Sequence, residues 1–284
     1  MIVATLLVML ALGLFFDWDG VVVRSETPKA AGWVLAALSL RGLAERELLD
    51  RLKTASQSKA AAHEVIAMLT TKHPNLLMQV CAMAGQSRPA TCKGVAKLIL
   101  GDDSPSTQAE LDRERNSLRS PLLLYQSEPI SGTLELLRAL HGRVPLGLVT
   151  QAASPDVEKQ AAALSIPLDL FGAVECVGDP FYESMAESVD RKTVAYAVAC
   201  ARVRCKPSNS IAFEDSDSGL ESAKAAGLEC IGLRESTNHQ QLTLAGLVVP
   251  DLGALAKPEI AGLFLGATAA ELMPVLRRLC GREG

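Results

Sequence analysis

Carboxylate side chains occur in pairs at two widely separated places in this sequence. Asp17 and Asp19 follow an apolar run and precede Gly20, and Glu214 and Asp215 directly follow a second apolar run. One carboxylate of the first pair can attack a phosphorus atom while the other protonates the leaving oxygen. Desolvation and mutual repulsion make the second pair costly unless a cation such as Mg²⁺ is present. These residue types therefore indicate magnesium-dependent phosphoryl transfer.

Each acidic pair also has an explanation that involves no catalysis. An Asp-x-Asp-Gly stretch can be a turn at a strand end or part of a calcium loop. A calcium loop of the EF-hand type needs further acidic residues at fixed offsets, and residues 21–23 supply none. Asp217 or Ser218 is expected to cap the following helix. A cap does not explain why Glu214 and Asp215 directly follow an apolar run.

Three further side chains are candidates for binding phosphate oxygens. Thr150 and Gln151 end an apolar run and offer a hydroxyl and backbone amides, although a Thr after a strand is more often a helix cap or a turn former. Lys192 precedes a predicted helix and could supply a cation, although most lysines are solvated at the surface. Lys206 lies in the loop before the last acidic strand, at the end opposite the predicted site.

The elements that must position these residues show an α/β pattern. From residue 129 onward, apolar runs alternate with amphipathic helical stretches, which predicts a parallel sheet covered by helices. The predicted strands are 12–16, 144–149, 173–177, 210–213, 230–233 and 247–249; the predicted helices are 132–141, 157–164, 193–202 and 218–226. We therefore expect a doubly wound, Rossmann-like parallel sheet, with the ligands at the carboxyl ends of its strands.

A helical segment separates the first predicted strand from the rest of the sheet. Residues 27–127 show helical periodicity and almost no strand signal, with leucines at helical spacings from Leu35 through Leu43 to Leu52. We interpret this segment as an inserted α-helical cap domain. The predicted organisation is a catalytic core at 12–26 and 128–256, a cap at 27–127, an apolar extension at 1–11 and a C-terminal helical tail at 257–284.

Composition and charge limit the classes of molecule that the protein is expected to bind. The net charge is -4 and the basic residues are scattered, so we expect no nucleic acid and a small phosphorylated metabolite instead. None of the seven cysteines forms a C-x-x-C pair, and their number is odd, which favours reduced thiols in a cytoplasmic compartment. The composition does not define an oligomeric state.

The N-terminal apolar run has two interpretations. It covers residues 1–16, has no Lys or Arg before it, and is shorter than the roughly 20 residues that a spanning helix needs. Residues 12–16 fit a buried parallel strand. For residues 1–11, an extension, an uncleaved anchor and an over-long start all stay open. We expect no stable membrane partner.

These motifs together resemble the haloacid dehalogenase superfamily, in its phosphatase and phosphomutase branch with a helical cap after the first motif. The resemblance covers most of residues 12–256. It rests on FDWDGVVVRSE at 16–26, PISGTLELLRAL at 129–140, LGLVTQAAS at 146–154 and SIAFEDSDSGLESAKAAGLECIGL at 210–233. The first and last of these are specific as a pair, and the middle two are supportive.

The resemblance implies a role for each candidate residue. Asp17 would form an aspartyl-phosphate, and Asp19 would act as acid and then as base. Thr150 and Lys192 would hold the phosphoryl oxygens. The Mg²⁺ ligands would be Asp17, the main-chain carbonyl of Asp19, Glu214 and Asp215. Catalysis of this kind depends mainly on positioning and charge neutralisation.

The lysine region departs from the family's pattern, which is Lys-Pro-x-Pro ahead of an aromatic residue. A gapless alignment through Tyr196 puts Asp190 at the lysine position. Lys192 therefore requires a slip of two residues, and Arg191 could substitute for it.

Three functions are compatible with these residues. The first is a phosphatase that hydrolyses a small phosphorylated metabolite, such as a sugar phosphate or phosphoglycolate. The second is a hexose-phosphate mutase of the beta-phosphoglucomutase type, which returns the phosphoryl group to its substrate. The irregular lysine region motivates the third, a non-catalytic relative that binds a ligand or partner, but the retention of all four acids argues against it.

Overall fold

The structure, a computed structural model, describes residues 11–83, 86, 88–234 and 241–280. The described residues of 1–24 and 129–284 form one compact unit, unit 1, and those of 25–128 form a second, unit 2. The units therefore divide at 24/25 and 128/129, where the sequence predicted boundaries at 26/27 and 127/128. The predicted extension at 1–11 lies outside the described residues except for Ala11.

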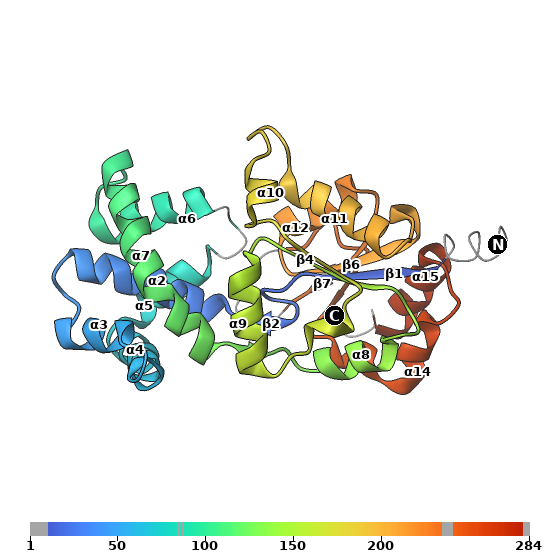
Figure 1. Ribbon diagram of the computed structural model, residues 1–284, viewed down its shortest axis with the longest axis horizontal. Helices are drawn as coiled ribbons and strands as arrows, with labels where there is room; N and C mark the ends of the chain where they lie inside the picture. Colours follow the sequence, from blue (N-terminus) through green and yellow to red (C-terminus); the bar gives the residue numbers. More distant parts are fainter. Residues whose placement is uncertain (1–10, 84–85, 87, 235–240, 281–284) are drawn as a thin grey trace. The chain divides into compact units, whose positions relative to one another are not determined.

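Unit 1 contains a six-stranded sheet in which every pairing is parallel (Figure 1). In spatial order the strands are β5 (Ala173–Cys176), β4 (Leu146–Thr150), β1 (Gly13–Phe16), β6 (Ser210–Glu214), β7 (Glu229–Leu233) and β8 (Leu247–Val249). The predicted α/β class is therefore confirmed. Two short strands, β2 (Val23–Arg24) and β3 (Glu128–Pro129), form a separate two-stranded sheet.

The central strand β1 lies where the strand order reverses. It pairs with β4 on one side and with β6 on the other, through Phe16 opposite Leu148 and Phe213. The rings of Phe16 and Phe213 stack with their centroids 4.5 Å apart. All four residues of β1 are buried, as expected for a strand covered on both faces. The carboxyl ends of β1, β4 and β6 thus meet at a topological switch point, where sheets of this type bind ligands.

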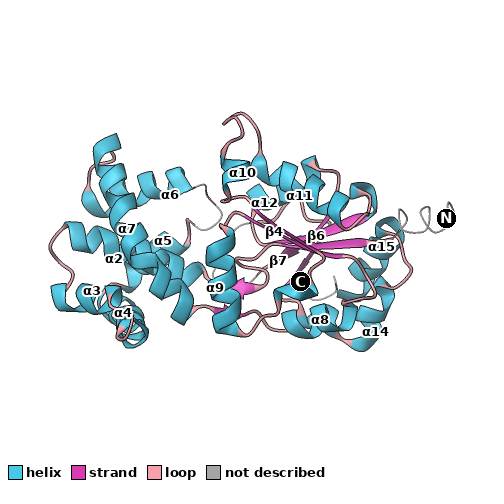
Figure 2. Ribbon diagram, viewed as in Figure 1, coloured by secondary structure: helices cyan, strands magenta, loops and turns pink. Residues whose placement is uncertain are grey.

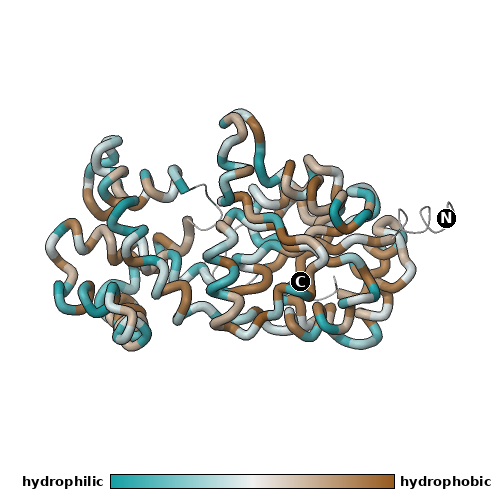
Figure 3. Tube along the Cα trace, in the orientation of Figure 1, coloured by the Kyte–Doolittle hydropathy of each residue, from teal (hydrophilic) through white to brown (hydrophobic). Residues whose placement is uncertain are grey.

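Helices cover both faces of the sheet (Figure 2). Leu14 and Phe16 face a core shared with α8 (Thr133–Leu140) and α15 (Ala269–Cys280), whereas Phe15 faces a second core shared with α11 (Arg191–Arg202) and α12 (Asp217–Ala225). Colouring by hydropathy shows mostly hydrophobic strands between helices of mixed character (Figure 3). The helices of unit 1 are α8 (Thr133–Leu140), α9 (Ser154–Leu164), α10 (Pro180–Glu183), α11 (Arg191–Arg202), α12 (Asp217–Ala225), α13 (Gly253–Ala256), α14 (Pro258–Ala261) and α15 (Ala269–Cys280), with 3-10 turns at Leu168–Leu170, Pro207–Asn209 and Gly262–Phe264.

The C-terminal segment, residues 257–280, is helical and contributes side chains to the core of unit 1. Leu272 and Leu276 of α15 are buried in the same core as β1. The side chain of Asn209 accepts a hydrogen bond of 2.8 Å from the N–H of Ala269 at the start of α15. The segment predicted as a tail therefore packs against the sheet.

Unit 2 contains only helices among its described residues, apart from the first residue of β3. Leu35, Leu52 and Leu111 lie in its buried core. Leu43, which the leucine spacing placed in the same helical pattern, is instead exposed in the loop between two helices. No helix among the described residues of the chain combines the length and apolar character needed to cross a bilayer. The helices of unit 2 are α2 (Glu26–Leu40), α3 (Arg46–Lys53), α4 (Ser58–Lys72), α5 (Pro74–Cys81), α6 (Arg88–Val95) and α7 (Pro105–Gln126), with a π-helical turn at Ala96–Leu100.

Candidate active site

Asp17 follows β1 directly and is held by the neighbouring strand. Its N–H donates a 3.0 Å hydrogen bond to the carbonyl oxygen of Phe213. The chain then turns tightly: the N–H of Val23 donates to the carbonyl oxygen of Trp18 at 2.9 Å, and that of Gly20 donates to the carbonyl oxygen of Val23 at 2.8 Å. The turn therefore begins at the end of β1, immediately after Asp17.

Two glycines make room for the acidic side chains. Gly20 has a φ of +80°, and a Cβ atom there would lie 2.0 Å from Oδ2 of Asp215. A Cβ atom on Gly219 would lie 2.0 Å from Oε2 of Glu214. Any larger residue at either position would displace a carboxylate, and at Gly20 it would also adopt an unfavourable backbone conformation.

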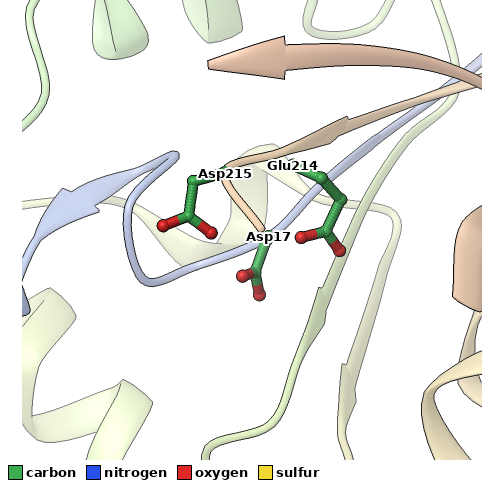
Figure 4. Close-up of side chains that lie close together, drawn as sticks. All are labelled: Asp17, Glu214 and Asp215. Atoms are coloured by element: carbon green, nitrogen blue, oxygen red, sulfur yellow. The ribbon is translucent and has the colours of Figure 1, made fainter. Parts of the chain in front are cut away.

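Three carboxylates from two strand ends converge (Figure 4). Asp17, Glu214 and Asp215 each place one oxygen within 4.8 Å of the others, and Asp17 lies between the other two in the close-up. Glu214 is completely buried, and Asp17 and Asp215 are each 7% exposed. Like charges that lie this close together and are buried away from solvent repel strongly unless a cation neutralises them.

The donor set fits a hard divalent cation. All three side chains offer carboxylate oxygens, which Mg²⁺ prefers. Oε2 of Glu214 is buried, and no described residue donates a hydrogen bond to it. Asp19 is only half-buried, and its carboxylate does not belong to this group of three; the resemblance assigns to Asp19 only a main-chain carbonyl as a metal ligand.

Lys192 is the cation that the described residues bring to this cluster. Its Nζ lies 3.2 Å from Oδ1 of Asp17 and 2.7 Å from Oε1 of Glu214, and its side chain is 3% exposed. Burial by itself would lower the pKa of Lys192, but the negative charges of Asp17 and Glu214 outweigh burial and raise the pKa above its ordinary value. One ammonium against three carboxylates still leaves an excess of negative charge.

The start of α11 explains why Lys192 and not Arg191 points inward. The side chain of Asp190 caps the helix by accepting a 3.0 Å hydrogen bond from the N–H of Lys192. Arg191 is only half-buried, and its Nη2 donates to the carbonyl oxygen of Met185 at 3.1 Å. The irregular motif thus brings a lysine to Asp17 two residues later than the gapless alignment indicates.

Thr150 and Gln151 differ in their surroundings. Thr150 is buried at the end of β4, beside β1, and its Oγ1 accepts a 3.1 Å hydrogen bond from the N–H of Ala152. Because the hydroxyl is the acceptor in this bond, its proton can still be donated to a phosphate oxygen. The side chain of Gln151 is exposed.

Two residues of the site were missed by the sequence analysis. One is Tyr196, which the sequence indicated only as the aromatic residue of the lysine motif. Its hydroxyl donates to Oε1 of Glu214 at 2.5 Å. Its position four residues after Lys192, on the same helix face, was the available signal.

The second is Ser216, which caps α12 in place of the predicted Asp217 or Ser218. Its Oγ accepts a 3.1 Å hydrogen bond from the N–H of Gly219.

Comparisons with known proteins give one family model and curated phosphatases. A family model described as haloacid dehalogenase-like hydrolase matches residues 12–227. Validoxylamine A 7'-phosphate phosphatase of Streptomyces hygroscopicus subsp. limoneus is 26% identical over 247 residues, covering 86% of this chain and 96% of that protein. Fructose-1-phosphate phosphatase YqaB of Escherichia coli is 22% identical over 222 residues, covering 78% of this chain and 96% of that protein.

Solved structures share the fold. A predicted phosphoglycolate phosphatase from Haemophilus somnus superposes with a TM-score of 0.62 at 15% identity, covering 88% of this chain and 97% of the other. At this level of identity the similarity concerns the fold alone.

Proposed function

This chain belongs to the haloacid dehalogenase-like hydrolase family, and on that premise we propose that it is a magnesium-dependent phosphatase acting on a small phosphorylated metabolite. The observation that carries the proposal is the convergence of three buried carboxylates and one buried ammonium from β1, β6 and α11. A cluster of this charge suits a divalent ion and a phosphoryl group.

The two steps of the reaction use the first acidic pair. An oxygen of Asp17 attacks phosphorus and forms a new P–O bond, while the bond from phosphorus to the leaving oxygen breaks and that oxygen takes a proton from Asp19. Water then attacks the phosphorus atom of the phosphoaspartate and gives a proton to Asp19, while the bond from phosphorus to the Asp17 oxygen breaks. Inorganic phosphate leaves, and Asp17 is restored.

The remaining residues bind and neutralise charge. Lys192, the hydroxyl of Thr150 and the main chain at Gln151 hold the phosphoryl oxygens. Bound Mg²⁺ supplies positive charge that offsets the charge developing on the phosphoryl group. The residues that would hold it are Asp17, Asp19 through its carbonyl oxygen, Glu214 and Asp215.

The curated relatives support a phosphatase over a mutase. Both are named as phosphatases, one for validoxylamine A 7'-phosphate and the other for fructose-1-phosphate. These names also support a small phosphorylated molecule, such as a sugar phosphate, as the substrate class.

The test is an assay of the purified chain with a generic aryl phosphate, with and without Mg²⁺. We expect turnover with Mg²⁺ and its loss in EDTA. A panel of sugar phosphates and phosphoglycolate, scored for phosphate release and for isomer formation, then separates the phosphatase from the mutase. Absence of turnover on every substrate with any divalent metal would contradict both.

A further inference from the structure

We propose that Tyr196 is a positioning residue for the metal site, in which its hydroxyl fixes the Glu214 carboxylate and thereby sets the affinity for the divalent cation. This inference rests on the proposed metal-dependent function. It concerns a residue that touches neither the phosphoryl group nor the cation in the proposed reaction.

Two donors on one helix face hold the same oxygen of Glu214. Tyr196 lies four residues after Lys192 on α11, so the two side chains lie on the same face of the helix. The Tyr196 hydroxyl donates to Oε1 at 2.5 Å, and Nζ of Lys192 lies 2.7 Å from the same atom. Both side chains are buried, as is Glu214, so no solvent competes for this oxygen.

The tyrosine ring has a defined position. It is completely buried and packs edge-on against Phe15, with the ring centroids 6.5 Å apart. Phe15 belongs to the central strand β1, whose carboxyl end leads into Asp17. The hydroxyl is therefore held by the same strand and helix that present Asp17 and Lys192.

Saturating Oε1 leaves the other oxygen for a cation. Oε2 receives no hydrogen bond from any described residue. If the tyrosine hydroxyl were absent, Lys192 alone would restrain Glu214, and the carboxylate could rotate to share both oxygens with the ammonium. Removal of an outer-shell partner of a metal ligand typically lowers metal affinity by about 10- to 100-fold.

The molecule contains a matched control. The hydroxyl of Tyr182 also donates at 2.5 Å to a buried strand carboxylate, Oε2 of Glu175. Glu175 is not one of the three clustered acids and pairs instead with Arg202. Tyr196→Phe and Tyr182→Phe therefore remove the same kind of hydrogen bond, and only the first touches the proposed metal site.

The experiment is a titration of the full-length protein with Mn²⁺, followed by electron paramagnetic resonance, together with calorimetric titration with Mg²⁺. Tyr196→Phe is expected to weaken both affinities by about 10- to 100-fold, and Tyr182→Phe to leave them within about twofold. The apparent Mg²⁺ requirement of turnover should rise in Tyr196→Phe, with kcat recovering at saturating Mg²⁺. Melting temperatures in EDTA should fall similarly in both variants.

The outcomes separate this inference from the proposed function. Equal affinities of wild type and Tyr196→Phe would overturn the inference and leave the function intact. An equal loss of affinity in both variants would also overturn it, because the effect would then follow from lost stability alone. If the wild-type protein binds neither cation, the proposed function fails, and the inference fails with it.

Discussion

Lys192 lies within ion-pair distance of two acids that would otherwise repel each other. Its Nζ is 3.2 Å from Asp17 and 2.7 Å from Glu214, and all three side chains are almost fully buried. Because these carboxylates raise the pKa of Lys192 above its ordinary value, the side chain stays charged at neutral pH. The same ammonium is available to a phosphoryl group that arrives at Asp17.

Replacing Lys192 tests which cation matters. Lys192→Met keeps most of the apolar stem and removes the charge, so we expect kcat on an aryl phosphate to fall by about 10²- to 10³-fold. Arg191→Ala, one residue away, should change kcat by no more than about threefold, because the Arg191 side chain donates its hydrogen bond to the carbonyl oxygen of Met185 and not to an acid of the site. The opposite ranking of the two variants would show that Arg191 is the phosphate-binding cation.

The sequence alone could predict the acids but not the choice between these two cations. Asp17, Glu214 and Asp215 each follow an apolar strand, and strand ends are predictable from hydrophobicity. Lys192 and Arg191 are neighbours, and only the exact start of a helix decides which of them points inward. Helix starts are the least reliable part of a prediction.

At the scale of elements, the turn after β1 depends on a glycine. Gly20 has a positive φ, and the side chain of Asp215 occupies the space where a Cβ atom would lie. Any other residue type would therefore clash with Asp215. Gly20→Ala is therefore expected to displace Asp215 and to lower turnover by at least about tenfold, with a cost of about 1–2 kcal/mol for the backbone conformation. Turnover and the free energy of unfolding are the quantities to measure.

Gly42 provides the control for this prediction. It also has a positive φ, of +67°, but a Cβ atom there would meet no atom within 4 Å. Gly42→Ala should cost similar stability and leave turnover unchanged. Equal losses of turnover in the two variants would show that instability alone explains the effect at Gly20.

The cap of α11 makes a pH-dependent contribution to stability. Burial alone would raise the pKa of Asp190, but hydrogen bonds from Thr193 and Ser222 lower it below its ordinary value of 3.8. A carboxyl group whose pKa is lowered by folding stabilises the native state above its unfolded pKa, and this stabilisation is lost as the pH falls through its folded pKa. Asp190→Ala removes the hydrogen bonds that cap α11, and this loss should cost about 1 kcal/mol at neutral pH.

The measurement is the free energy of unfolding of wild type and Asp190→Ala as a function of pH. The difference between them should be constant near neutrality and should shrink below about pH 4. A difference that is independent of pH down to about pH 2 would contradict the assignment of a charged cap.

Most strands could be predicted because each is a short apolar run, and the run at 210–213 is β6 with one further residue. The short helices α10 and α13 were not predicted, since four residues carry no usable periodicity. Tyr196 was missed as a site residue for a different reason. Its hydroxyl meets a residue eighteen positions away, and only the packing of α11 against the sheet brings them together.

At the scale of the whole molecule, cation binding should be linked to the stability of unit 1. The three acids come from β1 and β6, so a cation that binds them favours the folded sheet. At a concentration 100 times the dissociation constant, this linkage is worth about 2.7 kcal/mol. We expect Mg²⁺ to raise the melting temperature of the wild-type protein relative to EDTA, and Asp215→Asn to abolish most of that increase. The measurement is the melting temperature of each protein with Mg²⁺ and with EDTA. An identical increase in Asp215→Asn would show that the cation does not bind at the three clustered acids.

The covalent role of Asp17 is the central claim, and it has a direct measurement. Turnover of an aryl phosphate by wild type and by Asp17→Asn should be compared at saturating Mg²⁺, with circular dichroism to show that both are folded. We predict that Asp17→Asn lowers kcat by about three orders of magnitude or more, because an amide oxygen cannot form the phosphoaspartate. Turnover undiminished in folded Asp17→Asn would contradict the account.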